Sequence, residues 1–417
     1  MNVFFDLSRS IRRAAHSTLT GIDRVDLAYA RELPALCETV TYLAGRGRPR
    51  VISPARVSTF LAESARPTDD PVSTALFSHL AKSAWDGKEA VHLSEHYQRR
   101  QTLLGNAIAA LSLRVSMRAL PKVTSRAVYL NTSHSGLDDT RYLQALKIQG
   151  IRIVVVLHDL IPIDFPEFCR NGEDRRHCAR LANIVLFADL VVTVSAYTRE
   201  RFLAWSVERK TAPPTTVVVP LATEHHFLSA TVSSRDLSPL PYFVCLGTIE
   251  ARKNHSFLLL VWRRLVERLG DSCPRLVLVG RRGWKIELPL DLLRLGKGLS
   301  SAVVEVADLS DRGVVALMAG AHGLVQPSLA EGFGLPLVEA GALGIPVIAS
   351  DIPAHREIAP VGTLLLDPLD APAWERSILA VAGLPRNRFP RTTSSLRHWR
   401  THVAETVDAI EQNIRDN

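Results

Sequence analysis

Cysteine is scarce in this chain of 417 residues. The five cysteines are odd in number and scattered, which argues against a disulfide framework and indicates reduced thiols in a cytosolic protein. Cys169, His177 and Cys178 lie near one another in the sequence, but their spacing fits no standard zinc site. We therefore expect no structural zinc at these residues.

Long apolar runs are missing as well. No stretch reaches the ~18 apolar residues that a membrane-spanning helix needs. The first residues, Met1 to Asp6, predict a short strand rather than a secretory leader. A hydrophobic content of 47% argues against disorder, and 417 residues exceed one typical core, so two domains are expected.

Acidic residues are fewer than basic ones, which gives a formal net charge of +8. The arginines are scattered and no nucleic-acid motif accompanies them, so no nucleic-acid partner is expected. The candidate partners are nucleotide-sugar phosphates, lipid pyrophosphates and an anionic membrane surface. A basic solvent-exposed surface without a partner is the alternative. Residues 96–120 predict either a basic amphipathic helix on a membrane or a helix packed on the N-terminal core.

Short buried strands alternate with helical patterns along most of the chain, which predicts an α/β fold. The clearest strands are at 3–6, 127–130, 151–157, 190–195, 216–220, 242–246, 275–280, 303–306 and 345–349. A polar stretch at 229–241 with Pro239 and Pro241 predicts a linker between a first domain at 1–228 and a second at 242–390. Residues 45–75, rich in proline, arginine and serine, predict an irregular insertion.

The most informative stretch runs from Ser328 to Glu339 and reads Ser-Leu-Ala-Glu-Gly-Phe-Gly-Leu-Pro-Leu-Val-Glu. Its two glycines predict a loop whose backbone can approach a ligand, and Pro336 suits the first turn of a helix. The loop follows a strand, at the edge where open α/β sheets bind ligands. Free amides at the helix start favour an anion, and two glutamates accept bonds from hydroxyls. The stretch therefore predicts a site for a ligand with hydroxyls and phosphate.

This stretch resembles the donor site of retaining GT-B glycosyltransferases of family 4. The likeness rests on Glu331 and Glu339 with Gly-Phe-Gly between them, and on Tyr242–Asn254, which is similar to the family's first strand and phosphate loop. The resemblance implies two Rossmann-like domains that face a central cleft. It also implies that a C-terminal helix within 391–417 returns to the first domain.

The resemblance further implies roles for single residues. Glu331 would hold the hydroxyls of the donor sugar and Glu339 those of the ribose. Two positions depart from the family pattern, because Gly21 stands where many members have two glycines and Thr248 where many have arginine. The other donor-binding residues implied are Gly21, Gly247, Thr248, Gly280, Arg281, Gly332, Phe333, Gly334 and Leu335.

Two cations and a histidine complete the expected catalytic set with Glu331. Arg252 and Lys253 stand just before a predicted helix, where the helix dipole repels them, so a bound pyrophosphate would offset that repulsion. His158 directly follows the strand at 151–157 and is expected to point into the cleft. In similar enzymes this histidine meets the donor sugar or its phosphate; the alternative is a structural histidine held by Asp159.

The expected reaction moves a hexose from a nucleoside-diphosphate sugar to a hydroxyl with retained configuration. The sequence has no convincing Asp-x-Asp motif, so no essential metal cofactor is expected. The phosphate loop resembles those of mannosyl- and rhamnosyltransferases of bacterial O-antigen and exopolysaccharide assembly. GDP-mannose is the first candidate donor, and a dTDP- or UDP-sugar the second. The expected acceptor is a growing or lipid-linked glycan at the cytoplasmic face of the membrane. The alternatives are a non-catalytic GT-B-like binding scaffold and a nucleotide-sugar epimerase.

Overall fold

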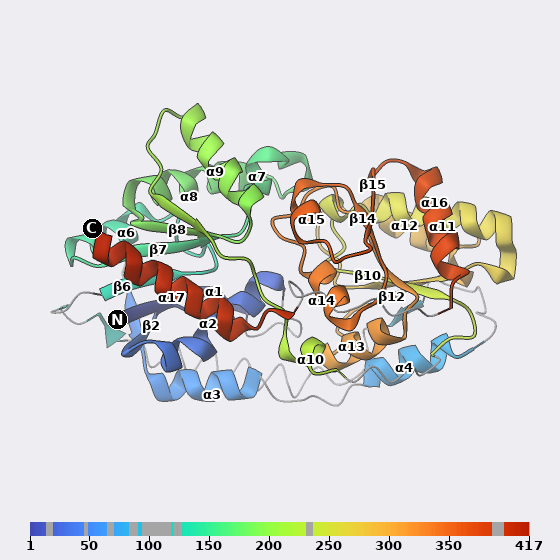
Figure 1. The fold of residues 1–417 in the computed structure, drawn as a ribbon, viewed down its shortest axis with the longest axis horizontal. Coiled ribbons are helices and arrows are strands. Elements are labelled where there is room, and N and C mark those ends of the chain that lie inside the picture. The colour runs from blue at the N-terminus through green and yellow to red at the C-terminus, as the bar shows by residue number, and fades with distance from the viewer. Residues whose placement is uncertain are drawn as a thin grey trace.

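The structure is a computed structural model that describes residues 1–13, 20–45, 49–64, 71–82, 91–93, 118–120, 123, 127–230, 237–385 and 396–416. The expected amphipathic helix at 96–120 lies outside the described residues except for 118–120. The middle of the expected linker, 231–236, lies outside them too. Two α/β lobes stand side by side in Figure 1.

The first lobe is built on a sheet whose described strands have the order β5-β3-β2-β1-β6-β7-β8-β9. The strands are β1 (Asn2–Asp6), β2 (Thr39–Ala44), β3 (Arg50–Ile52), β5 (Arg118–Ala119), β6 (Ala127–Asn131), β7 (Arg152–Leu157), β8 (Leu190–Thr193) and β9 (Thr215–Val218). Pairing is parallel except where β3 joins β2 and β5. The helices are α1 (Ser8–Arg13), α2 (Gly21–Leu36), α3 (Pro54–Ser64), α6 (Thr140–Ile148), α7 (Ile161–Asp164), α8 (Glu173–Phe187) and α9 (Ala196–Glu208).

The expectation of an irregular insertion at 45–75 is wrong. The segment contains β3, α3 and the start of α4 (Pro71–Leu80). Pro54 and Pro71 each begin a helix, because the first helical turn does not need the N–H that proline lacks. Proline was therefore a helix start signal here rather than a helix breaker.

The second lobe has a described sheet of order β15-β14-β13-β10-β11-β12-β4 with parallel pairing throughout. Its strands are β10 (Tyr242–Leu246), β11 (Arg275–Val279), β12 (Val303–Val306), β13 (Gly323–Gln326), β14 (Val347–Ser350), β15 (Leu364–Leu366) and β4 (Val91–Leu93). The helices are α11 (His255–Leu269), α12 (Glu287–Leu295), α13 (Asp311–Gly320), α14 (Leu335–Leu343), α15 (Pro353–Ile358) and α16 (Ala371–Ala382). Strand β4 departs from the expected division at residue 228, because it pairs with β12 at the edge of the second sheet.

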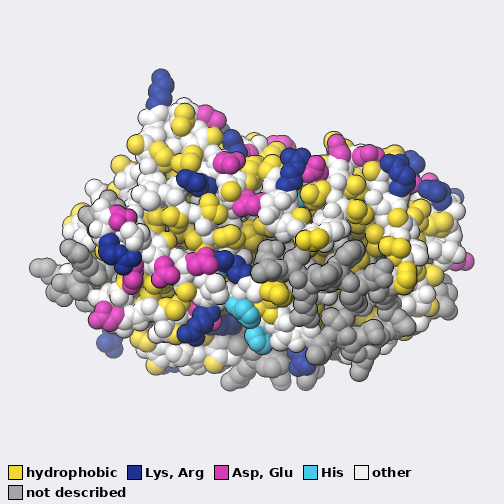
Figure 2. Space-filling model, viewed as in Figure 1, with side chains coloured by type: hydrophobic (Ala, Val, Ile, Leu, Met, Phe, Trp, Pro, Cys, Tyr) yellow, Lys and Arg dark blue, Asp and Glu magenta, His cyan; other side chains and the backbone are white. Residues whose placement is uncertain are grey.

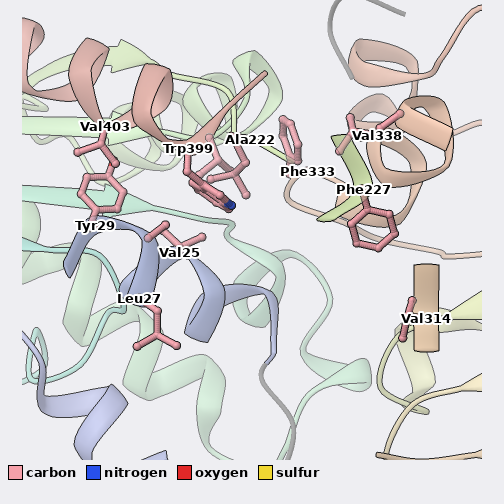
Figure 3. Close-up of a cluster of buried hydrophobic side chains, with 14 of the residues drawn as sticks. Val25, Leu27, Tyr29, Ala222, Phe227, Val314, Phe333, Val338, Trp399 and Val403 are labelled. Atoms are coloured by element: carbon pink, nitrogen blue, oxygen red, sulfur yellow. The ribbon is translucent and has the colours of Figure 1, made fainter. Parts of the chain in front are cut away.

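The C-terminal helix α17 (Trp399–Asp416) lies on the first lobe, against α2 (Figure 1). Tyr29 of α2 forms hydrogen bonds with His402 at 2.9 Å and with Thr406 at 2.8 Å. One apolar cluster continues from this contact into the second lobe through α10 (His225–Leu228). Figure 3 shows Trp399 beside Val25 of the first lobe. Phe227 of α10 lies farther across the cluster, near Val338 of the second lobe. The two lobes therefore share a packed boundary.

None of the helices in the described part of the chain combines the length and apolar character needed to cross a bilayer. Figure 2 shows lysine and arginine side chains intermixed with aspartate and glutamate over the face in view. The excess positive charge is therefore not gathered into one basic patch on the described part of that face.

Candidate active site between the two lobes

The site is built around the loop that joins β13 to α14. Gly334 precedes the helix with φ +113°, a conformation that favours glycine, and Pro336 occupies the first helical turn as expected. The loop is buried rather than exposed, with Glu331 at 6% and Phe333 at 6% exposed. Phe333 packs into the apolar cluster shared by the lobes (Figure 3). Its side chain therefore holds the loop in place.

Three neighbouring side chains hold Glu331 in this loop. It forms ion pairs with Lys253 and with Arg252, the latter at 2.6 Å, and Ser328 Oγ donates to its Oε1 at 2.8 Å. Burial works to raise the pKa of Glu331, but the charges of Lys253 and Arg252 outweigh it and lower the pKa well below its usual range. Glu331 is therefore an ionised carboxylate, which accepts hydrogen bonds and donates none.

Arg252 and Lys253 lie in a short 3₁₀ turn between β10 and α11. Arg252 also pairs with Glu250 at 2.6 Å and donates to the carbonyl of Ala330 at 3.1 Å. The sequence suggested a phosphate as the partner that offsets the helix dipole at these residues. In the structure Glu331 and Glu250 supply negative charge there.

Glycines fix the turn that carries these cations. Gly247 has φ +144°, and a Cβ placed on Gly280 would lie 1.9 Å from the carbonyl oxygen of Gly247. A Cβ on Gly283 would lie 2.9 Å from Cγ2 of Thr248. The ends of β10 and β11 therefore approach too closely for side chains at 280 and 283. The structure thus brings together Gly247, Thr248 and Gly280 as the sequence analysis grouped them.

Arg281, the expected lining residue after β11, pairs with Asp308 at 2.9 Å. Asp308 follows β12 and has φ +65°. Both residues stand at the carboxyl edge of the second sheet, on neighbouring strands. Arg281 therefore belongs to the same edge as the phosphate loop, with its guanidinium held by a carboxylate.

The first lobe meets the loop at Gly332. A Cβ on Gly332 would lie 2.1 Å from the carbonyl oxygen of His158 and 2.9 Å from Cβ of Asp159. Ser195 Oγ donates to the carbonyl of Gly332 at 2.8 Å, and Thr198 Oγ1 lies 3.3 Å from it. Gly332 is therefore a point of backbone contact between the lobes.

The imidazole of His158 is turned toward its own lobe. Its Nε2 lies 2.7 Å from the carbonyl oxygen of Thr132, which makes Nε2–H the donor. Burial lowers the pKa of His158, so the ring is neutral at pH 7. The carboxylate of Asp159 accepts instead from the amide of Ile161 at 3.1 Å. His158 thus meets the loop of the second lobe through its backbone.

A second cross-lobe contact surrounds Gly21. A Cβ on Gly21 would lie 3.3 Å from Cδ1 of Leu335, so the start of α2 faces the start of α14. One turn along α2, Arg24 pairs with Glu339 of α14 at 2.9 Å and with Asp311 of α13 at 2.7 Å. Glu331 and Glu339, which the sequence placed together, each carry a cationic partner.

Sequence analysis missed three buried polar residues at this site: Gln326, whose Nε2 donates to Ser328 Oγ at 3.3 Å, Ser328 as a partner of Glu331, and His355. His355 Nδ1 donates to the carbonyl of Ser350 at 2.9 Å, and among the described residues its Nε2 has no hydrogen-bond partner. A Cβ on Gly334 would lie 3.5 Å from this Nε2. No sequence pattern distinguishes such a histidine from one in an ordinary helix, because its position depends on how α15 packs on the loop.

The fold and these contacts define a GT-B protein. Solved structures support the fold: that of HepE from Anabaena with UDP-glucose has a TM-score of 0.58 at 15% identity and covers 100% of this chain and 98% of its own. The structure of sucrose-phosphate synthase from Thermosynechococcus elongatus has a TM-score of 0.60 at 15% identity and covers 100% of both chains. The resemblance to the GT-B fold is confirmed.

Residues 240–383 match the family described as glycosyl transferases group 1. The match falls within the second lobe, and it agrees with the resemblance predicted from the motifs around Glu331 and Lys253. Among curated relatives, the serotype-specific mannosyltransferase WbdA of Escherichia coli is 30% identical over 245 residues, which are 55% of this chain and 29% of WbdA. The O-antigen chain mannosyltransferase B of Escherichia coli is 28% identical over 238 residues, 55% of this chain and 60% of its own. Each match covers less than two thirds of these relatives.

Proposed function

We propose that the chain is a hexosyltransferase that moves a sugar from a nucleoside-diphosphate donor to a hydroxyl of a bacterial glycan. The observation that carries this proposal is the arrangement of two buried carboxylates, Glu331 and Glu339, around the start of α14 with Arg252 and Lys253 beside the first of them. The group 1 domain and the mannosyltransferase relatives support it.

In the proposed reaction, the bond between the anomeric carbon and the diphosphate oxygen breaks and a bond to the acceptor oxygen forms with retained configuration. The acceptor proton ends on the leaving nucleoside diphosphate. Negative charge grows on that diphosphate, and Arg252, Lys253 and the amides at the start of α14 stabilise it by electrostatic catalysis. Glu331 accepts bonds from the sugar hydroxyls and Glu339 from the ribose hydroxyls. In this scheme Arg252 and Lys253 stabilise the leaving diphosphate without a metal cofactor.

GDP-mannose is the first candidate donor, because the curated relatives are mannosyltransferases. A UDP- or dTDP-sugar is the second candidate. HepE of Anabaena, which shares the fold, has been solved with UDP-glucose. The proposed acceptor is a growing or lipid-linked glycan, and peripheral contact with an anionic membrane surface at its cytoplasmic face is part of the proposal. The net charge of +8 supports such a contact.

The first experiment is a thermal-shift panel of GDP, UDP, dTDP and their sugars, because a ligand that binds the folded state raises its melting temperature. A shift confined to one nucleotide identifies the donor class. Transfer is then assayed with that donor and a mannose-terminated lipid-linked acceptor. A folded protein that responds to none of these nucleotides contradicts the proposal.

Glu331→Gln tests the site with Glu375→Gln as its matched control. Glu375 of α16 is also a buried carboxylate that holds two cations, Arg264 and Arg268. Glu331→Gln leaves the buried ammonium of Lys253 without its carboxylate partner, which costs about 3–5 kcal/mol. The cost of Glu375→Gln is smaller, because Arg264 and Arg268 are more than half exposed. We expect only Glu331→Gln to abolish transfer. Equal residual activity in the two variants, with both folded by circular dichroism, would refute the assignment of Glu331.

A further inference from the structure

Arg24 links the first lobe to the carboxylate that the proposed function assigns to the ribose. Its side chain is 15% exposed and lies in α2, while both of its acceptors belong to the second lobe. Nη1 donates to Oε1 of Glu339 at 2.9 Å and Nη2 to Oδ1 of Asp311 at 2.7 Å. The guanidinium thus bridges a buried carboxylate of α14 and a half-exposed one at the start of α13.

The charged and titratable groups around Glu339 come from several elements. Arg24 faces it from α2, Asp311 from α13, and Glu224 from the residue before α10. His226 of α10 stands 4.0 Å from Asp311, with its pKa lowered by burial. Arg24 therefore places a positive charge beside Glu339, while Asp311 and Glu224 place negative charges near it.

Burial raises the pKa of Glu339 to about 7, against the pull of Arg24, and the charges of Asp311 and Glu224 add to the rise. A protonated carboxyl loses part of its capacity to accept hydrogen bonds and becomes a donor. A carboxyl group that must accept bonds from two neighbouring hydroxyls therefore binds them more tightly while it is charged.

We propose that Arg24 is a positioning residue, which fixes the Glu339 carboxylate through one oxygen and holds it as an anion for the vicinal hydroxyls of a nucleotide's ribose. This inference rests on the proposed function and extends it, because it gives the first lobe a part in nucleotide binding. Arg24 acts through Glu339, so no contact of its own with the nucleotide is required.

Arg24 and Asp311 have opposite electrostatic effects on Glu339 although they belong to the same bridge. Loss of Arg24 raises the pKa of Glu339, and loss of the Asp311 charge lowers it. A bridge that served only to hold the lobes together would be weakened by either change, and in the same direction. The two variants therefore distinguish a positioning role from a merely structural one.

The test measures dissociation constants of GDP, UDP and dTDP by calorimetry between pH 6 and pH 9. The variants are Arg24→Met and Asp311→Asn, with Arg264→Met as the control. Arg264 also pairs with a buried glutamate, Glu375, but within the second lobe. Protonation of the nucleotide's own phosphate affects all variants alike, so the comparison is between the pH midpoints at which binding is lost.

We expect the wild type to lose affinity about fivefold between pH 7 and pH 6, since the ionised fraction of a group with a pKa near 7 falls by that factor. Arg24→Met should move the midpoint to higher pH and raise the dissociation constant at pH 7 about tenfold or more, with the gap closing toward pH 9. Asp311→Asn should move it to lower pH, and Arg264→Met should not move it. If Arg24→Met does not fold, Arg24→Lys takes its place in the test. This variant keeps the positive charge, so its pH midpoint should stay close to that of the wild type.

Midpoints that move in the same direction in Arg24→Met and Asp311→Asn, or that do not move, would overturn the inference while the proposed function stands. A wild-type protein that binds none of the three nucleotides would overturn the proposed function itself. The two failures are therefore told apart by the wild-type titration alone.

Discussion

Gly332→Ala is the most direct test of the contact between the lobes. The added Cβ would lie 2.1 Å from the carbonyl oxygen of His158 and 3.0 Å from its carbonyl carbon. Favourable contacts between heavy atoms lie at about 3.5–4.0 Å, so the methyl group needs more than 1 Å of movement. Both sides of the clash are backbone or Cβ atoms rather than flexible side-chain ends, so the loop or the end of β7 has to shift.

The magnitude follows from what such a shift disturbs. Overpacking typically costs about 1–3 kcal/mol. Ser195 and Thr198 stand to lose their hydrogen bonds to the carbonyl of Gly332, each worth about 0.5–1.5 kcal/mol. The stability of the joined lobes should therefore fall by about 2–6 kcal/mol. Opening of the boundary relieves the clash, so the radius of gyration should also rise.

Small-angle scattering and thermal unfolding measure the two effects. Gly383→Ala is the matched control, because its φ is −78° and the nearest atom to an added Cβ lies 3.5 Å away, an ordinary contact. Ser195→Ala separates the hydrogen bond from the clash and should lower stability by about 1 kcal/mol. If Gly332→Ala kept the melting temperature and radius of the control variant, the lobes would not touch at this residue.

Two further predictions concern the same boundary and the buried histidines. Glu357→Gln should lower stability by about 0.5–2 kcal/mol and loosen the boundary in scattering, because Glu357 of α15 accepts the amides of Ala196 and Tyr197 at the start of α9; Arg356→Gln, one residue earlier and exposed, is the control. Thermal stability should be highest above about pH 6.5 and fall as the pH drops below it. Buried histidines with lowered pKa stay neutral in the folded state, whereas the unfolded chain protonates them. Each such histidine lowers the free energy of unfolding by up to about 1.4 kcal/mol per pH unit. Buried carboxyls with raised pKa act in the opposite direction and offset part of this loss; a melting temperature that stays constant or rises from pH 7 to pH 5 would contradict the balance. The histidines are His134, His158, His177, His226, His255, His355 and His402, and the opposing carboxyls are Asp6, Asp26, Glu224 and Glu339.

Local signals predicted most of the elements that form the site. Gly334, Pro336 and Gly344 mark the loop, start and end of α14, and the apolar run before Gly247 is β10 at the expected residues. These features depend on the backbone preferences of single residues, which follow directly from residue identity. The misread segment at 45–75 shows the limit of this reasoning, because a proline is compatible with both a loop and a helix start.

Pairings between distant residues could not be predicted in the same way. Lys253 and Glu331 are 78 positions apart, and Arg24 and Glu339 are 315 apart. Sequence analysis identified Lys253, Glu331 and Glu339, but neither Arg24 nor the ion pairs that these residues form. Strand β4 has three residues and joins the edge of the second sheet, a pairing that no local pattern specifies. Such contacts follow from how the sheets and lobes pack.

The ion pairs that Arg252 and Lys253 form with Glu331 have a consequence for donor binding in the proposed reaction. Arg252 and Lys253 are already close to Glu331, and Arg252 also to Glu250, so a diphosphate would share these cations rather than meet them free. Sharing spares the ligand-free protein the cost of unpaired buried charges. It also keeps the cations at fixed positions before the diphosphate arrives, and preorganised charge is what stabilises a leaving group most effectively. Glu331 would then have two roles. It holds Arg252 and Lys253 in place before the donor binds, and it accepts hydrogen bonds from the sugar hydroxyls afterwards.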